Sequence, residues 1–170
     1  MFFLELIMPS SLTINILMVC LGNICRSPSA HGVLLKQLEN KNLTNKITVD
    51  SAGTGDWHVG CTPDPRAIKT AAARGYDISR LKARQIKKPD FERFDYILAM
   101  DESNRKELLK LAPDIFKGKI ELLLDYGGSA HREVPDPYYS GDQGFELVLD
   151  LVEDASSRFL ESVISKNKLI

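Results

Sequence analysis

Short apolar runs alternate along this chain with longer stretches in which apolar residues recur every three or four positions. Four of the runs are predicted to be β-strands: residues 14–19, 46–51, 96–100 and 120–124. The first run is apolar at every position except Asn15, which is typical of a strand buried in a parallel sheet. The second alternates polar and apolar residues and is the second predicted strand.

The stretches between and after the strands have helical periodicity. Ser27 suits a helix N-cap and Pro28 the first helical position, so the first helix is expected to begin there. Further helices are expected to begin at residues 63–65, near 88–93 and at Asp101 or Ser103. The clearest amphipathic helix comes last, and its apolar face is Phe145, Val148, Leu149, Val152, Phe159, Leu160, Val163 and Ile164.

Strands that alternate with helices predict a parallel sheet with right-handed crossovers. We therefore expect an α/β fold: a single-domain three-layer sandwich with a four-stranded parallel sheet and helices on both faces. A chain of 170 residues is the size of one such domain. We assign this domain to residues 13–170 and interpret residues 1–12 as a mobile N-terminal extension.

Net charge, the length of the apolar runs and the number of cysteines argue against some classes of function. A net charge of −1 gives no sign of nucleic-acid binding. No stretch approaches the ~18 consecutive apolar residues of a membrane span. Three cysteines, an odd number, in a chain without a signal peptide indicate a reducing compartment, so we expect a cytoplasmic protein.

The candidate chemistry begins where the first strand ends, with Cys20, five further residues, and Arg26. A tight loop that opens directly into a helix is suited to bind an anion, because its N–H groups and the helix N-terminus offer partial positive charge. Gly22 permits a backbone conformation closed to bulkier residues, and Asn23 tolerates a left-handed one. Arg26 can hold two phosphate oxygens at once. The expected phosphate-binding residues are Leu21, Gly22, Asn23, Ile24, Cys25 and Arg26.

In that electrostatic field we expect the Cys20 sulfur to be a thiolate, which beside a bound phosphate ester is a nucleophile aimed at phosphorus. The alternative is a buried cysteine at a strand end with an ordinary surface arginine. The strand before the loop, the Ser-Pro helix start after it and Gly-Asn within it favour the functional interpretation. A nucleotide-binding P-loop is excluded, since the chain has no G-x-x-x-x-G-K-[ST].

Residues 19–28, Val-Cys-Leu-Gly-Asn-Ile-Cys-Arg-Ser-Pro, resemble the signature of the low-molecular-weight protein tyrosine phosphatases. Similar segments follow at residues 50–53, 57, 63–67, 83–85, 94–98, 100–104 and 136–139. The resemblance implies the phosphotyrosine protein phosphatase I-like fold. It also implies hydrolysis of phosphotyrosine through a cysteinyl-phosphate intermediate, with no metal or cofactor.

Cleavage of a phosphate monoester requires a general acid for the leaving oxygen. The candidate is Asp136, in Val134-Pro135-Asp136-Pro137-Tyr138-Tyr139, where two prolines stiffen the backbone. We expect a partly buried carboxyl group with aromatic surroundings. Without the cysteine loop this segment would be interpreted as a surface turn, but the resemblance assigns the acid to Asp136.

Other residues are expected to shape the site. Asn23, Ser27 and Ser51 resemble the family's polar network that supports the loop, with ordinary turn residues and a helix cap as the alternatives. The family often carries a histidine before its Ala-Arg-Gln, whereas this chain has Arg80-Leu81-Lys82 in that region. An aromatic slot deep enough for phosphotyrosine but too deep for phosphoserine is expected from Ile24, Trp57, Tyr138 and Tyr139.

The other two cysteines have separate interpretations. Cys25 can trap an oxidised Cys20 as a reversible disulfide, or it is simply a small buried thiol. Cys61 is interpreted as structural. A zinc site from the three cysteines and His58 is disfavoured, because Arg26 would repel the metal and the spacings fit no common zinc motif.

Three competing functions follow from the same residues. Arsenate reductases of this fold need a further redox cysteine pair, and only Cys61 is available for it here. Protein arginine phosphatases resemble the chain but tend to have threonine where it has Ile24. A phosphoprotein-binding module without turnover is disfavoured by the intact set of Cys20, Arg26 and Asp136. We expect a monomer that binds a phosphotyrosine-bearing protein and releases phosphate, with no nucleic-acid or membrane partner.

Overall fold

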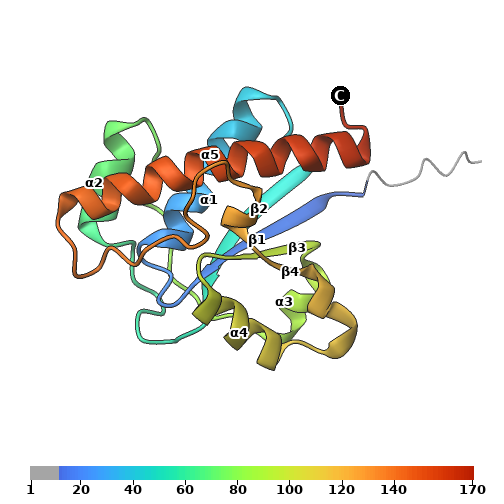
Figure 1. Ribbon diagram of the computed structural model, residues 1–170, viewed down its shortest axis with the longest axis horizontal. Helices are drawn as coiled ribbons and strands as arrows, with labels where there is room; N and C mark the ends of the chain where they lie inside the picture. The colour runs from blue at the N-terminus through green and yellow to red at the C-terminus, as the bar shows by residue number, and fades with distance from the viewer. Residues whose placement is uncertain (1–11) are drawn as a thin grey trace, which may run out of the picture.

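The computed structural model describes residues 12–170, and its centre is a four-stranded sheet. The strands are β1 (Ile14–Cys20), β2 (Ile47–Gly53), β3 (Tyr96–Ala99) and β4 (Ile120–Leu122). All pairings are parallel, in the order β2-β1-β3-β4 (Figure 1). The predicted extension over residues 1–12 lies, apart from Leu12, outside the described residues.

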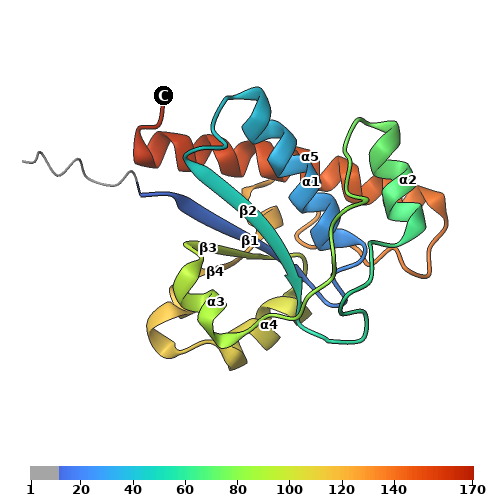
Figure 2. The ribbon, with the colours of Figure 1, turned by 180° about the vertical axis from the view of Figure 1, so that it is seen from behind.

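Helices cover both faces of the sheet. The helices α1 (Arg26–Asn40) and α5 (Asp142–Asn167) lie on one face, and α3 (Lys88–Arg93) and α4 (Glu102–Leu111) lie on the other (Figures 1 and 2). The remaining helix, α2 (Pro65–Ala73), packs beside α5. The predicted three-layer α/β architecture is therefore confirmed.

The core explains why β1 is so apolar. Its residues alternate between the two helical layers, so both faces of the strand are buried. Ile16 and Met18 pack in the cluster that includes Phe159 of α5, while Leu17 and Val19 pack in the cluster that includes Phe91 of α3. Burial of each large side chain contributes roughly 1.5–3 kcal/mol. The central strand is thus held firmly where its carboxyl end must present Cys20.

The region around the fourth strand differs from the prediction in two ways. The fourth strand was expected to reach Leu124 but ends at Leu122, and Leu123–Tyr126 form a 3₁₀ turn. Another 3₁₀ turn, Asp114–Lys119, precedes β4. The pattern of apolar residues in the sequence did not predict this turn. Apolar residues continue through the second turn because Leu123 and Leu124 are buried in the core, so periodicity alone could not place the strand end.

The first helix also begins differently. It starts at Arg26, with Cys25 in the N-cap position and no side-chain cap, so the prediction of Ser27 as the N-cap was wrong. The Ser27 hydroxyl instead points back toward the loop, where it contacts Cys20. At α4 the cap is Asp101, one of the two expected candidates, and its Oδ1 accepts a hydrogen bond from the Asn104 N–H.

Within residues 12–170, none of the helices combines the length and the hydrophobicity that crossing a membrane would require.

Candidate active site

The candidate site lies at the carboxyl end of β1, where the strand order makes a crevice. The helix after β1 covers one face of the sheet and the helix after β3 covers the other, so the two connections leave adjacent strands in opposite directions. Ligands of open α/β sheets bind at such points. Cys20 ends β1, opposite Gly53 of β2. A Cβ on Gly53 would lie 2.6 Å from the Leu21 carbonyl oxygen, so glycine permits this close approach of the loop.

Two polar groups contact the Cys20 sulfur. The Asn23 N–H donates to it at 3.3 Å, and the Ser27 hydroxyl oxygen lies 3.1 Å away. The residue is buried. The first of the predicted site residues therefore lies buried in a small polar network at the end of β1.

Asn23 shapes the loop with both its backbone and its side chain. Its φ of +56° is in the left-handed region, as predicted. Its amide Nδ2 donates to the Ser27 hydroxyl at 2.8 Å, and its Oδ1 accepts from the Arg84 N–H at 3.0 Å. Gly22, by contrast, does not have positive φ. Its small size serves a close contact instead, because a Cβ there would lie 3.0 Å from the His58 ring.

Arg26 is buried, with 3% of its surface exposed, and three oxygen-bearing groups lie close to its guanidinium. One guanidinium nitrogen donates to Asp101 and to the Val134 carbonyl, the latter at 3.1 Å. The other nitrogen lies 3.7 Å from the Asp136 carboxylate. Although burial opposes it, the negative charges of Cys20 and Asp101 raise the pKa of Arg26. The guanidinium therefore remains a fixed cation beside the loop.

The partner Asp101 was not predicted as a site residue, although it was expected to cap α4. It follows β3, the strand next to β1, so both carboxyl ends bring their residues to the same edge of the sheet. One carboxylate oxygen caps the helix and the other holds Arg26. The position of Asp101 directly after a strand next to β1 was the sequence feature that could have identified it as a site residue.

Asp136 lies on the long connection between the Leu123–Tyr126 turn and α5. The connection is fixed to the sheet by the Val134 N–H, which donates to the Met100 carbonyl at 2.8 Å. The Asp136 side chain is 48% exposed, which is more open than the aromatic enclosure expected from the sequence. Its Oδ1 accepts from the Tyr138 N–H at 3.1 Å, which orients the carboxyl group.

A pocket of about 350 Å³ joins these groups. The expected slot residues all line it, together with His58, which the sequence analysis considered only as a ligand of a disfavoured zinc site. Tyr138 and Tyr139 meet edge to face with ring centroids 4.9 Å apart. Tyr139 is 96% exposed and Trp57 71% exposed, so the rim of the pocket is aromatic and open. The lining residues are Cys20, Leu21, Gly22, Ile24, Cys25, Arg26, Trp57, His58, Asp136, Tyr138 and Tyr139.

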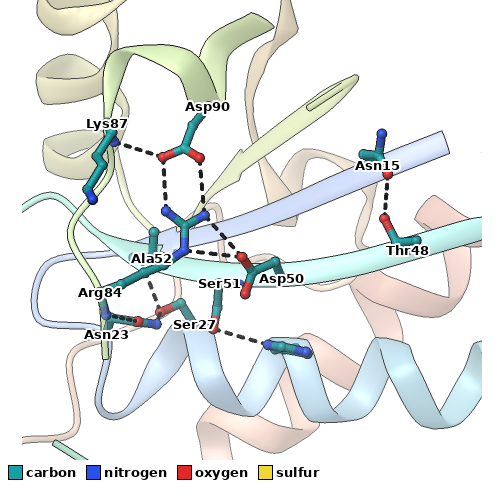
Figure 3. Close-up of polar contacts among 11 residues, drawn as sticks. Asn15, Asn23, Ser27, Thr48, Asp50, Ser51, Ala52, Arg84, Lys87 and Asp90 are labelled. Atoms are coloured by element: carbon teal, nitrogen blue, oxygen red, sulfur yellow. Dashed lines mark hydrogen bonds and ion pairs between the residues drawn. The ribbon is translucent and has the colours of Figure 1, made fainter. Parts of the chain in front are cut away.

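An ion-pair cluster centred on Arg84 supports the loop from the β2 side (Figure 3). The Arg84 guanidinium donates to Asp50 at 3.1 Å and to Asp90 at 3.0 and 3.3 Å. Asp90 also accepts from the Lys87 N–H at 2.7 Å. Because the Arg84 backbone N–H binds Asn23, this cluster ties the loop to β2 and α3.

We expect Arg84→Met to lower the free energy of unfolding by about 1–3 kcal/mol, because it leaves the buried Asp90 carboxylate with fewer donors. Looser anchoring of Asn23 is expected to lower kcat/KM for aryl phosphates about tenfold. Urea unfolding and steady-state kinetics measure the two effects. Unchanged values of both would contradict the anchoring role. Lys88→Met, which removes a nearby exposed cation, serves as the control.

Ser51 lies on β2, and its hydroxyl is 3.2 Å from Nδ1 of His31 in α1. Burial of the imidazole lowers the pKa of His31, against the raising effect of Asp50. A histidine thus contacts the predicted support residue from α1, although Arg80-Leu81-Lys82 replaces the family's usual histidine region. The loop-support role of Ser51 stays a prediction.

The remaining predicted residue, Cys25, is buried and lines the same pocket. Burial, with additional effects of Asp64 and Cys20, raises the pKa of the Cys25 thiol to about 12. Cys20, Cys25 and Cys61 are all free thiols in this structure. Across residues 12–170, no three His, Cys, Asp or Glu side chains are grouped so as to hold a metal ion.

The fold and the site define a parallel α/β protein in which a cysteine begins the loop between the central strand β1 and helix α1. Comparisons with known proteins agree. Residues 15–169 match the family described as low molecular weight phosphotyrosine protein phosphatase. A pig protein of that name is 42% identical over 158 residues, which are 92% of this chain and 99% of the relative. The chain belongs to the low molecular weight phosphotyrosine protein phosphatase family.

Solved structures show the same fold. A protein tyrosine phosphatase from Entamoeba histolytica, with Hepes in its active site, is 41% identical with a TM-score of 0.87 and covers 93% of this chain and 100% of its own. An arginine phosphatase from Drosophila is 35% identical with a TM-score of 0.82. It covers 87% of this chain and 96% of its own.

Proposed function

We propose that this protein hydrolyses phosphotyrosine monoesters in proteins through a cysteinyl-phosphate intermediate. The observation that carries the proposal is the convergence on one pocket of the Cys20 sulfur, the Arg26 guanidinium and the Asp136 carboxyl group. A nucleophile, a fixed cation and a candidate acid are the three groups that the reaction needs.

In the first step the Cys20 thiolate donates an electron pair to phosphorus while the bond from phosphorus to the aryl oxygen breaks. Asp136, as the carboxylic acid, gives its proton to that departing oxygen. Arg26 and the N–H groups of residues 21–26 hold the other phosphate oxygens and stabilise their charge in the transition state.

In the second step a water molecule attacks phosphorus and passes its proton to the Asp136 carboxylate. The sulfur–phosphorus bond breaks, phosphate leaves, and the electron pair returns to Cys20. The Ser27 hydroxyl and the Asn23 N–H, which already contact the sulfur, stabilise the thiolate as it re-forms. No metal or cofactor takes part in this scheme.

The substrate class is inferred from the walls of the pocket. Ile24 and the aromatic rings of Trp57, Tyr138 and Tyr139 offer an apolar slot for the phenyl ring of phosphotyrosine. Phosphoserine is too short to carry its phosphate to the loop past such walls. Phosphoarginine is the second candidate, since the Drosophila arginine phosphatase has the same fold. Ile24, where arginine phosphatases tend to have threonine, favours phosphotyrosine.

We expect the wild-type enzyme to prefer a phosphotyrosine peptide to a phosphoarginine peptide of the same sequence by at least about tenfold in kcat/KM. Released phosphate measures both reactions, with Cys20→Ser as the blank. A preference for phosphoarginine would keep the mechanism but overturn the substrate class. Phosphate binding without turnover of either peptide would leave a binding module.

Several further points stay predictions. Monomeric state and a cytoplasmic location rest on the sequence, as does the domain assignment to residues 13–170. Trapping of an oxidised Cys20 by Cys25 is supported by their place in one loop, with both thiols free. Phosphate is the product that the proposed reaction implies.

A further inference from the structure

The start of α2 is attached to the phosphate-binding loop. The Asp64 N–H donates to the carbonyl oxygen of Ile24 at 2.8 Å. The Asp64 carboxylate caps the helix by accepting from the Arg66 N–H at 2.8 Å. Its side chain is only 9% exposed. The helix N-terminus is therefore fixed with respect to the loop that carries the nucleophile.

The Arg66 side chain extends from this fixed point toward the other catalytic loop. Its Nε and Nη2 donate to the two Asp64 carboxylate oxygens at 3.0 and 2.8 Å, which is the bidentate geometry that holds a guanidinium plane rigidly. The same guanidinium lies 5.5 Å from the centroid of the Tyr138 ring and 4.8 Å from that of Phe145, a buried residue of α5. Both distances are typical of cation–π contacts.

Tyr138 in turn contacts the candidate acid through its backbone. The Tyr138 N–H donates to Asp136 Oδ1 at 3.1 Å. The connection that carries both residues has no helix or strand between the Leu123–Tyr126 turn and α5, so its position depends on such contacts. A continuous path of contacts therefore links the phosphate-binding loop to Asp136 through Asp64, Arg66 and Tyr138.

We propose that Arg66 is a positioning residue for the general acid: its guanidinium holds the Tyr138 ring and thereby places Asp136 over the phosphate-binding loop. The proposal rests on the proposed function, in which Asp136 protonates the leaving oxygen. In this role Arg66 contacts neither the Cys20 sulfur nor the bound phosphate. Its removal is expected to weaken acid catalysis while the nucleophile and the phosphate-binding loop remain intact.

Two small aryl phosphates separate acid catalysis from binding. Phenyl phosphate releases phenol, which is about as weak an acid as a tyrosine side chain (pKa ~10). Its cleavage therefore needs a general acid to protonate the leaving oxygen. p-Nitrophenyl phosphate releases a stabilised phenolate and needs it far less. We expect Arg66→Met to lower the ratio of kcat/KM for phenyl phosphate to that for p-nitrophenyl phosphate about tenfold. Arg66→Lys, which keeps the cation but not the planar fork, is expected to restore part of the ratio.

A double-mutant cycle shows whether Arg66 acts through Asp136. Asp136→Asn alone is expected to lower the ratio strongly, and adding Arg66→Met to it is expected to change the ratio no further. Arg74→Met is the matched control, because Arg74 also joins α2 to α5, through Glu146, Asp150 and Glu153. It should leave the ratio at the wild-type value. The rate at which iodoacetate alkylates Cys20 should be equal in wild type and Arg66→Met.

Three results would overturn the proposal. One is a wild-type ratio in Arg66→Met, and another is an equal further loss when Arg66→Met is added to Asp136→Asn. If either of these two results is found while Asp136→Asn alone strongly lowers the ratio, only the role of Arg66 is contradicted. The third is a wild-type ratio in Asp136→Asn itself, which also contradicts the acid assigned under the proposed function.

Discussion

Replacement of Cys20 by serine is expected to abolish turnover of aryl phosphates. The serine hydroxyl keeps the shape of the site but remains protonated, and a neutral hydroxyl is a far weaker nucleophile toward phosphorus than a thiolate. Phosphate release from p-nitrophenyl phosphate measures the effect.

The matched control is Cys61→Ser, which changes an exposed thiol outside the pocket and should retain full activity. Binding of inorganic phosphate by the Cys20→Ser variant shows whether its loop is still formed. Turnover by this variant within about tenfold of wild type would mean that another group attacks phosphorus.

Replacement of Asp136 by asparagine is expected to lower kcat/KM for phenyl phosphate about 10²- to 10⁴-fold, since the leaving phenolate then departs without a proton. Asparagine retains the shape and an oxygen that can accept from the Tyr138 N–H. A smaller loss is expected for p-nitrophenyl phosphate. Stopped-flow or steady-state rates with both substrates measure the difference.

Asp142→Asn is the control for this experiment, because Asp142 is an exposed carboxylate in the first turn of α5 and lies outside the pocket. It should change neither rate appreciably. Near-normal activity of Asp136→Asn on phenyl phosphate would remove the acid from the mechanism.

Local sequence patterns were sufficient to locate the four strands, apart from the end of the fourth, and the loop that follows the first strand. A strand buried on both faces has to be apolar throughout, and residues 14–19 are nearly so. Asn23 was expected in a left-handed conformation because few other residues adopt it readily, and its φ is +56°. In these cases the physical requirement and the residue that meets it are within a few positions of each other.

Contacts between distant residues could not be predicted in the same way. Arg26 and Asp101 are 75 positions apart, and only the order of the strands brings them together. The contacts of Arg84 with Asp50 and of Arg66 with Tyr138 likewise depend on how whole elements pack. An arginine in the sequence shows that a cation is available but not which carboxylate or ring it meets.

Ser27 shows the same limit at short range. Its place before Pro28 has the pattern of an N-cap, yet its hydroxyl contacts Cys20 and accepts from the Asn23 side chain. The propensity of serine for caps was overridden by the polar network around the sulfur. A departure from a local rule therefore coincided with the functional site, as expected where catalysis constrains a residue.

The proposed mechanism requires transfer of the phosphoryl group from the substrate to the Cys20 sulfur. Acid quenching of the Asp136→Asn variant during turnover of p-nitrophenyl phosphate, followed by mass spectrometry of its peptides, tests this most directly. One added phosphoryl group is expected on the peptide that contains Cys20, and none on the same peptide from Cys20→Ser. Turnover with that peptide unmodified at every quench time, or a phosphoryl group on another residue, would contradict the proposed mechanism.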